Sequence, residues 1–410
     1  MNAAARVIRS HDIIRSMKSD DLDLTIEKLV FGGDGLAHHE GKVYFVPGAL
    51  PGEKVLVRVM NDKKNYGKTK RLKILANSPA RVDPPCPYYG QCGGCQYQHI
   101  RYPEELRWKE YQVREGFERH FRPDAKRVEP IRFGPGDYHY RNSVTLHRTS
   151  GQTGTAQRLG FFGVDNTSVL GVENCLLANQ RLEAVFKSRY LMKKGEDDRT
   201  FKCAEDGEIV SSQEAKLYRT RVGKESLWAS SAGFFQNHAA VTELVADRLL
   251  DWVVEARPKC FVDLYAGVGT FSILSAWDVP DVCGVEENPN SMECLRKNFL
   301  ERNIKPAGMI EGRVENVFPA FSKTLPSEGI FVFMDPPRSG IDRSLSLFLA
   351  ESDGIGHLAY LSCDLAILLR DLKLILSKGK YVIRQVVPFD MFPRTKHIEV
   401  MVLLVNLKNG

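Results

Sequence analysis

The sequence predicts an α/β protein whose C-terminal half forms a mostly parallel, doubly wound sheet and whose N-terminal half is rich in β-strands. From residue 238 onward, short apolar stretches alternate with amphipathic helical stretches, the rhythm of a parallel sheet covered by helices on both faces. Before that point, strand-like stretches are separated by turns rich in Gly, Pro and Asn.

Composition and charge exclude several classes of protein. With 43% hydrophobic and 26% charged residues in 410, the chain is not collagen, a coiled coil or largely disordered, and its length allows two to three domains. No apolar run reaches the roughly 20 residues of a membrane helix. Residues 1–21 have the pattern of a polar tail without a secretion signal, so we expect a cytoplasmic protein. The net charge of +6 permits a polyanionic partner without requiring one.

The first region predicts a small five-stranded barrel. Short apolar stretches between residues 22 and 75 are separated by the turns FGGDG, GALPGE and NDKKNYGK. The last loop and strand, residues 61–73, gather Lys and Arg around Tyr66. This cluster fits a solvated loop and a nucleic-acid contact equally well.

The middle region combines a helix with further strands. Residues 103–121 predict an amphipathic surface helix, and strand-like stretches return between residues 138 and 230. We therefore divide the chain into a barrel at 20–79, a central β-rich domain at 80–232 and an α/β domain at 233–410.

The α/β region predicts its elements in order. Helices are expected at 239–256, 267–276 and 290–302, and strands at 259–266, 282–287, 329–337, 358–363, 380–389 and 399–407. Such sheets bind ligands at the carboxyl ends of their strands, so polar residues at those ends are candidate site residues.

Nine cysteines in a chain without a secretion signal indicate metal-binding or catalytic thiols more than a disulfide scaffold. Cys86, Cys92 and Cys95 lie within ten residues, and the two glycines of CGGC allow the backbone to fold tightly around an ion. Cys175, in a polar loop-like setting, is the best fourth ligand, with Cys203 as its competitor. Zinc and a [4Fe–4S] cluster both accept four thiolates, so the spacing leaves the choice open.

A nucleoside cofactor is indicated by FVDLYAGVGTFSI, residues 261–273. Gly267 and Gly269 allow a sharp turn that brings the backbone against a ligand at the start of the next helix. The spacing departs from the full dinucleotide fingerprint, which favours a different adenosine cofactor. Glu286, at the end of the following strand, is placed to accept hydrogen bonds from both ribose hydroxyls.

Three further strand ends carry reactive groups. Asp335 precedes two prolines that fix a rigid loop, and Arg338 follows where an enzyme methylating amines would carry a stacking aromatic. Cys363 lies between a strand and a helix, where the helix N-terminus is expected to favour the nucleophilic thiolate. His397 and Glu399 share one face at the entry to the last strand, so either could act as a base.

Together these motifs resemble the RNA 5-methyluridine (uracil-C5) methyltransferases. The resemblance covers nearly the whole chain and rests on CGGC, SAGFFQNH, DLYAGVGTFS, GVEENP, MDPPRSG, YLSCDLAILLRDL and DMFPRTKHIEVMVLL. It implies a TRAM-type, OB-like RNA-binding barrel, a Rossmann-like class I methyltransferase domain, S-adenosylmethionine as cofactor and RNA as partner. Ribosomal RNA is favoured slightly over transfer RNA, and a monomer is expected.

The resemblance also implies roles for individual residues. Cys363 would be the nucleophile and Glu399 the base, while the cofactor site would comprise Gln236, Tyr265, Gly267, Glu286 and Asp335. A [4Fe–4S] cluster would be held by Cys86, Cys92, Cys95 and Cys175.

The chain departs from the family pattern at three positions. Thr270 replaces Asn, Arg313 replaces Asn or Asp, and Leu365 replaces a proline, which predicts a looser turn behind Cys363. Two alternatives remain: a methyltransferase acting on another atom, and a catalytically silent RNA-binding scaffold.

Overall fold

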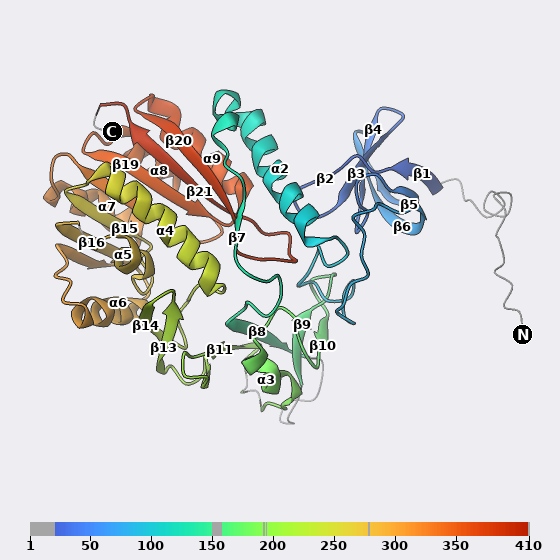
Figure 1. Ribbon diagram of the computed structural model, residues 1–410, viewed down its shortest axis with the longest axis horizontal. Coiled ribbons are helices and arrows are strands. Elements are labelled where there is room, and N and C mark those ends of the chain that lie inside the picture. The colour runs from blue at the N-terminus through green and yellow to red at the C-terminus, as the bar shows by residue number, and fades with distance from the viewer. Residues whose placement is uncertain (1–20, 150–157, 192, 194, 278, 409–410) are drawn as a thin grey trace, which may run out of the picture. The chain divides into compact units, whose positions relative to one another are not determined.

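The computed structural model describes residues 21–149, 158–191, 193, 195–277 and 279–408 (Figure 1). They form two compact units: the first holds the chain up to residue 85 together with 96–105, and the second holds 86–95 and 106–410. The polar tail predicted at residues 1–21 lies outside the described residues, except for its last residue. None of the helices in the described ranges is long and apolar enough to cross a membrane.

The first unit is a curled, mostly antiparallel sheet with an apolar interior. Its strands are β1 (Asp21–Thr25), β2 (Lys28–Leu29), β3 (Gly35–His39), β4 (Lys42–Val46), β5 (Lys54–Asp62) and β6 (Tyr66–Ala76), in the order β1-β5-β6-β4-β3-β2, with β4 and β6 parallel. Only two residues join the edge strands β1 and β2, so the sheet curls back on itself. The prediction of five strands is corrected to six, because the two-residue β2 is too short to leave a pattern. Lys68 and Lys70 are exposed on β6 with Tyr66, whereas the alternate residues Gly67 and Thr69 are buried.

The second unit is built on an eight-stranded sheet. Its order is β17-β16-β15-β18-β19-β21-β20-β7. The strands are β7 (Arg132–Phe133), β15 (Cys260–Leu264), β16 (Asp281–Glu286), β17 (Gly308–Glu311), β18 (Ile330–Met334), β19 (Ile355–Ser362), β20 (Tyr381–Asp390) and β21 (Glu399–Asn406). Within this sheet only β21 runs antiparallel to its neighbours. The start of β21 therefore lies at the edge where the parallel strands end.

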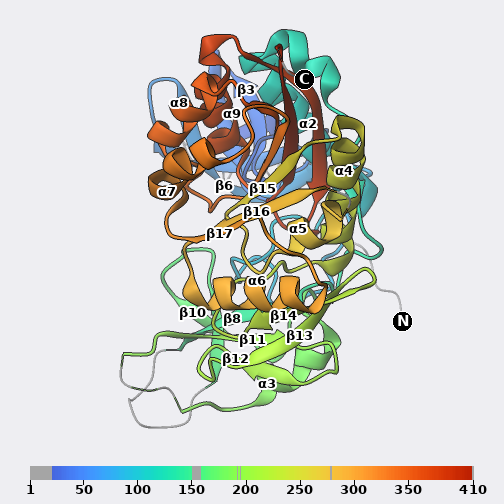
Figure 2. The ribbon, with the colours of Figure 1, turned by 90° about the vertical axis from the view of Figure 1, so that its left-hand side faces the viewer.

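Helices cover both faces of this sheet, as the alternating pattern predicts. Figure 2 shows α4 (Ala239–Ala256) and α5 (Thr270–Ser275) on one side of β15 and β16, and α7 (Val314–Phe321), α8 (Arg343–Glu351) and α9 (Leu365–Ile375) on the other. Alternate strand residues face the two layers: Phe261 and Phe331 pack with α4, and their neighbours Val262 and Val332 pack with α8 and α9. Helix α6 (Pro289–Glu301) belongs to the first layer and α2 (Tyr102–His120) to the second.

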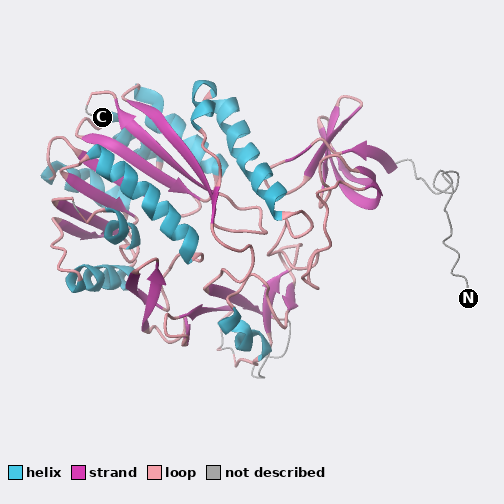
Figure 3. Cartoon of the chain, viewed as in Figure 1, coloured by secondary structure: helices cyan, strands magenta, loops and turns pink. Residues whose placement is uncertain are grey.

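The region between α2 and α4 is rich in short strands (Figure 3). A five-stranded sheet has the order β10-β9-β8-β11-β12, and β13 with β14 forms a hairpin. Their bounds are β8 (Ser143–Arg148), β9 (Leu159–Phe162), β10 (Val169–Gly171), β11 (Asp198–Cys203), β12 (Ile209–Ser211), β13 (Leu217–Val222) and β14 (Glu225–Ser230), and the short helix α3 (Glu183–Lys187) packs beside them. The predicted second β-rich region is present, with β11 and β13 as strands that the sequence patterns did not reveal.

Candidate active site

A cavity of about 1130 Å³ opens at the carboxyl edge of the eight-stranded sheet. Side chains from strands that are far apart in the sequence meet there because their carboxyl ends share one edge. All of the cofactor and catalytic residues predicted from the sequence line this cavity: Gln236, Tyr265, Gly267, Glu286, Asp335, Cys363 and Glu399. Thr270 and Arg313, two of the departures from the family pattern, line it as well.

The turn between β15 and α5 has a constrained backbone. Tyr265 has φ 62°, a left-handed conformation that is uncommon for an aromatic residue and is often found at functional sites. Gly269 has φ 83°, and a Cβ there would lie 2.4 Å from Leu295 Cδ1. Glycine is therefore required at 269, and the chain can turn tightly past the cavity into α5.

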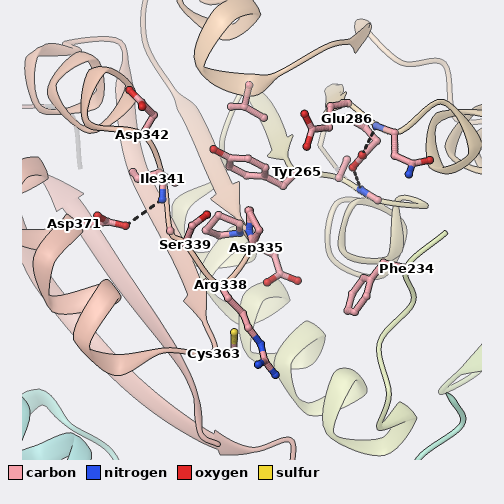
Figure 4. Close-up of a pocket in the computed structure, with 18 of the residues that line it drawn as sticks. Phe234, Tyr265, Glu286, Asp335, Arg338, Ser339, Ile341, Asp342, Cys363 and Asp371 are labelled. Atoms are coloured by element: carbon pink, nitrogen blue, oxygen red, sulfur yellow. Dashed lines mark hydrogen bonds between the residues drawn. The ribbon is translucent and has the colours of Figure 1, made fainter. Parts of the chain in front are cut away.

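Glu286 ends β16 with its carboxylate fixed at the cavity wall. Its Oε2 accepts a hydrogen bond of 2.8 Å from Gly267 N, and its Oε1 accepts one of 2.7 Å from Asn288 N (Figure 4). A carboxylate can accept about four hydrogen bonds, so acceptor capacity remains for a ligand. This arrangement fits the predicted contact with two adjacent hydroxyl groups.

Asp335 follows β18 and is held by Gln236, whose Nε2 donates to Asp335 Oδ2 at 2.8 Å. Burial raises the pKa of Asp335 to about 7, although the hydrogen bond from Gln236 opposes this shift. Near neutral pH, Asp335 can therefore exchange between its carboxyl and carboxylate forms. A nearby positive charge would favour the carboxylate.

Cys363 follows β19 at the same edge, and burial raises the pKa of its thiol to about 12. Glu399 and Asp335 raise this pKa as well, while Arg338 lowers it. The expectation that the helix N-terminus favours the thiolate is wrong for the free chain. Asp364 caps α9 by accepting hydrogen bonds from Ala366 N and Ile367 N, so its carboxylate occupies these helix N–H groups.

The turn behind Cys363 is held without a proline. In addition to the Asp364 cap, Ser362 Oγ accepts a hydrogen bond of 3.3 Å from Asp364 N. Leu365 is buried and faces Gly116 of α2, where a Cβ would lie 3.1 Å from Leu365 Cδ2. Polar caps and packing thus hold this turn in place of the ring, and the looser turn expected from Leu365 stays a prediction.

Glu399 lies beside Cys363 because β21 pairs antiparallel with β19. The register aligns Ser362 with Val400, which brings the residue before Val400 to the level of Cys363. Burial and the neighbouring Asp335 raise the pKa of Glu399 well above its usual value, and Arg338 opposes the shift. Its Oε2 is buried and has no hydrogen-bond partner among the described residues.

His397, the other candidate base, is absent from the residues that line the cavity. Its ring packs edge-on against Phe392, with centroids 5.9 Å apart, and burial lowers its pKa to about 4. Of the two candidates, Glu399 has the position that a base requires.

Two cavity residues had received no role in the site from sequence reasoning. Figure 4 shows Arg338 beside Cys363, where its positive charge stabilises the thiolate and Glu399 carboxylate forms. Phe234 lies at the cavity wall and is 66% exposed as a residue, so its ring is available to another aromatic group. The available signals were the position of Arg338 directly after two prolines and the paired aromatics in SAGFFQNH.

The four predicted metal-binding cysteines lie in one region of the second unit. Gly93 N, in the loop that carries three of them, donates to Phe162 O at 2.9 Å. Glu173 N donates to Tyr88 Oη at 3.1 Å, which joins this loop to the segment entering Cys175. The competitor Cys203 is buried on β11.

These thiols influence one another electrostatically. Burial raises the pKa of Cys92 and of Cys175, Cys86 raises both further, and Arg141 lowers both. Arg141 also interacts with Cys95. Nevertheless, no three or more His, Cys, Asp or Glu residues within the described ranges are arranged so that they could hold a metal ion.

Two family models match the sequence. The model described as tRNA (Uracil-5-)-methyltransferase matches residues 222–407, and the TRAM domain model matches residues 15–70. The first match spans the cavity residues and every strand of the large sheet except β7, and the second spans most of the N-terminal curled sheet.

Relatives match over nearly their full lengths. A protein of Aquifex aeolicus named as an RNA methyltransferase is 30% identical, with 95% of this chain and 99% of the relative covered. Another, from Bdellovibrio bacteriovorus and also named as an RNA methyltransferase, is 30% identical, with 92% and 93% covered. The crystal structure of Pyrococcus abyssi tRNA (uracil-54, C5)-methyltransferase with S-adenosyl-L-homocysteine superposes with a TM-score of 0.67 at 22% identity, covering 93% of this chain and 99% of that one. This similarity shows that the two proteins share a fold.

Proposed function

Because the chain belongs to the family of S-adenosylmethionine-dependent RNA (uracil-5-)-methyltransferases, we propose that it makes 5-methyluridine through a covalent bond from Cys363 to the target uracil. The observation that carries this mechanism is the meeting of Cys363, Glu399 and Asp335 in one cavity. A thiol, a buried carboxyl group and a cofactor-side carboxyl group are the parts that uracil-C5 methylation needs.

In this proposal the cofactor is held by groups on three neighbouring strands. The Glu286 carboxylate accepts hydrogen bonds from the ribose hydroxyls, and Gly267 lets the backbone approach the cofactor closely beside Tyr265. Asp335, held by Gln236, would interact with the positively charged sulfonium. S-adenosylmethionine supplies the methyl group as an electrophile on positively charged sulfur.

The chemical step uses Cys363 to activate a weak carbon nucleophile. Its thiolate, stabilised by Arg338 after the thiol proton has left to solvent, adds to uracil C6 and converts the ring to an enolate. C5 then takes the methyl group from the sulfonium, leaving S-adenosylhomocysteine. The Glu399 carboxylate removes the C5 proton, and elimination restores the C5=C6 bond and releases the Cys363 thiolate. The net change releases one proton for each methyl transferred.

The target base must leave its stack to reach this cavity, which suits loop RNA or a remodelled stem. The exposed ring of Phe234 at the cavity wall offers a stacking face for an unpaired base. Lys68, Lys70 and Tyr66 on β6 offer phosphate and stacking contacts on the curled sheet. We assign RNA binding to a domain at 20–79, cluster binding to 80–232 and methyl transfer to 233–410.

The pKa of Asp335 predicts how cofactor affinity depends on pH. S-adenosylmethionine carries a positive sulfonium, whereas S-adenosylhomocysteine has a neutral thioether there, so only the former gains from an Asp335 carboxylate. Since the pKa of Asp335 is about 7, the affinity ratio of the two ligands should rise several-fold between pH 6 and pH 8. Titration calorimetry at both pH values measures the ratio. Asp335→Asn should make it independent of pH, and an equal pH dependence in that variant contradicts the assignment.

The donor chemistry at Cys86, Cys92, Cys95 and Cys175 fits a [4Fe–4S] cluster, which requires four thiolates. The positive charge of Arg141 acts on three of these four thiols and would favour their thiolate forms, whereas burial and the neighbouring thiols oppose ionisation in the free chain. A bound cluster would supply structural order, and no step of the methyl transfer passes through it. Anaerobically purified protein should contain about four iron and four sulfide per chain with a broad brown absorbance. About one zinc per chain and no iron would refute the cluster.

The whole proposal is tested by transfer of labelled methyl from S-adenosylmethionine to RNA. We expect 5-methyluridine in the product nucleosides, with large-subunit ribosomal RNA slightly favoured over transfer RNA and the enzyme acting as a cytoplasmic monomer. Label in another nucleoside would indicate a methyltransferase that acts on a different atom. Absence of label in both RNAs, with the metal site loaded, would favour a silent RNA-binding scaffold.

A further inference from the structure

Residues 139–142 connect the four-cysteine region to two loops that carry residues of the active-site cavity. On one side their backbone pairs with residues 176–179, which directly follow Cys175. Three hydrogen bonds make this pairing: His139 N to Leu176 O at 2.8 Å, Arg141 N to Leu177 O at 2.9 Å, and Asn179 N to Arg141 O at 2.7 Å. The path of 139–142 is therefore fixed by the chain that carries the fourth cysteine.

The Arg141 side chain strengthens this connection. It interacts electrostatically with Cys95 and Cys175, one thiol from each of the two cysteine-bearing segments. Its Nε is buried and has no hydrogen-bond partner among the described residues. The guanidinium also interacts with Tyr140, and a negatively charged occupant of the four-cysteine site would add a second interaction that holds Arg141 and its neighbours in place.

Asn142, the next residue, holds the loop that enters the cavity. Its Nδ2 donates to Gln236 O at 3.0 Å, and its backbone N donates to Asn237 O at 3.1 Å. Gln236 in turn donates to Asp335. Two adjacent residues thus join the two sites: Arg141 interacts with the cysteines, and Asn142 holds the loop whose Gln236 fixes a cavity carboxyl group.

Tyr140 contacts a second loop, which carries another cavity residue. Its Oη donates to Pro393 O at 3.0 Å, and its ring stacks on His238 with centroids 4.7 Å apart and planes 18° apart. Pro393 follows Phe392, a cavity residue, in the loop that leads from β20 to Glu399 on β21. The hydroxyl therefore restrains the loop on the catalytic side.

We propose that residues 139–142 couple occupancy of the four-cysteine site to cofactor binding, with Tyr140 and Asn142 as positioning residues. The inference rests on the proposed cluster. Binding at the cysteines orders residues 175–179, their pairing fixes 139–142, and Asn142 and Tyr140 then hold the Gln236 and Pro393 loops. Because coupling between two binding sites is reciprocal, the cofactor should also stabilise the occupied cysteine site.

The test compares the affinity of the full chain for S-adenosylhomocysteine with and without metal at the cysteines, by titration calorimetry. We expect the loaded wild-type chain to bind about tenfold more tightly than the metal-free chain, within the usual range of coupling between sites. In Tyr140→Phe and Asn142→Ala this ratio should fall toward one while metal content and visible absorbance stay unchanged. Tyr381→Phe is the matched control, because Tyr381 Oη also donates to a carbonyl at 3.0 Å, at the other end of β20. It should keep the wild-type ratio.

Hydrogen exchange of the loaded variants gives a second measurement that does not depend on the metal-free chain being folded. Tyr140→Phe should exchange faster at 391–397, and Asn142→Ala at 235–238, with Tyr381→Phe unchanged at both. Suppose that both variants keep the wild-type affinity ratio and the wild-type hydrogen exchange, while the enzyme contains metal and makes 5-methyluridine. That result would overturn the coupling and leave the proposed cluster and reaction standing. A chain that binds no metal would refute the proposed cluster and the coupling with it, whereas missing 5-methyluridine in a loaded chain would refute only the proposed reaction.

Discussion

Replacing Cys363 with alanine should abolish methyl transfer, lowering turnover on the order of 10⁴-fold or more, while affinity for S-adenosylhomocysteine remains close to that of the wild type. Without the thiolate, uracil C5 stays a poor nucleophile, because no other described cavity residue offers a thiol. The cofactor contacts come from Glu286 and the turn at Gly267, which the substitution does not touch. Single-turnover transfer of labelled methyl and calorimetry measure the two quantities.

The control for this variant is Cys294→Ala, which removes a thiol buried in α6 away from the cavity lining. It should keep its turnover per folded chain. Trapping provides a second check: wild-type enzyme incubated with RNA containing 5-fluorouridine should form a stable adduct, since fluorine at C5 cannot leave as a proton, and Cys363→Ala should form none. Retained turnover in Cys363→Ala would end the covalent mechanism.

Much of the large sheet could be predicted, because its central strands and covering helices leave strong periodic patterns. The helix expected at 239–256 matches α4 at both ends. At its C-terminal end, Arg257 leaves the helix in a left-handed conformation. Strand β17 left no usable pattern, since its four residues are all partly or fully exposed at the sheet edge. Helix α7 is short and contains Pro319, which conceals its period.

The cavity could be located from the sequence because Glu286 ends a parallel strand, and Asp335 and Cys363 each directly follow one. Their ionisation could not be predicted in the same way. The pKa of Cys363 depends on its burial and on the charges of Glu399 and Arg338. These two residues belong to other segments of the chain, which the pairing of the strands brings to Cys363. Local sequence suggested that the helix N-terminus would favour the thiolate, and the three-dimensional neighbours outweigh that local effect.

Replacing Glu399 with glutamine should separate methyl transfer from release of the product. Addition of Cys363 and attack on the methyl group do not require the carboxylate, so one methyl group should transfer per chain. Removal of the C5 proton should then fail, lowering steady-state turnover roughly 10²–10⁴-fold. A protein–RNA adduct that survives denaturation should accumulate and be visible as a slower band on a denaturing gel.

The pKa of Glu399 makes glutamine a suitable replacement. A carboxyl group whose pKa is raised in the folded chain stabilises the fold most while neutral, and this contribution is lost as pH rises through the folded pKa. Glutamine keeps a neutral side chain of similar shape, so at pH 8 the variant should be at least as resistant to unfolding by urea as the wild type. Slow turnover in a stable variant then reports chemistry and not damage to the fold.

Two further variants decide whether the adduct reflects loss of the base. Cys363→Ala combined with Glu399→Gln should give no adduct, because the covalent bond needs the thiol. His397→Gln should turn over normally without adduct, since His397 does not line the cavity. If Glu399→Gln gives no adduct and keeps wild-type turnover, another group removes the C5 proton. If instead His397→Gln accumulates the adduct, the proton passes through the imidazole, and the buried Glu399 oxygen, which has no partner among the described residues, has a different role.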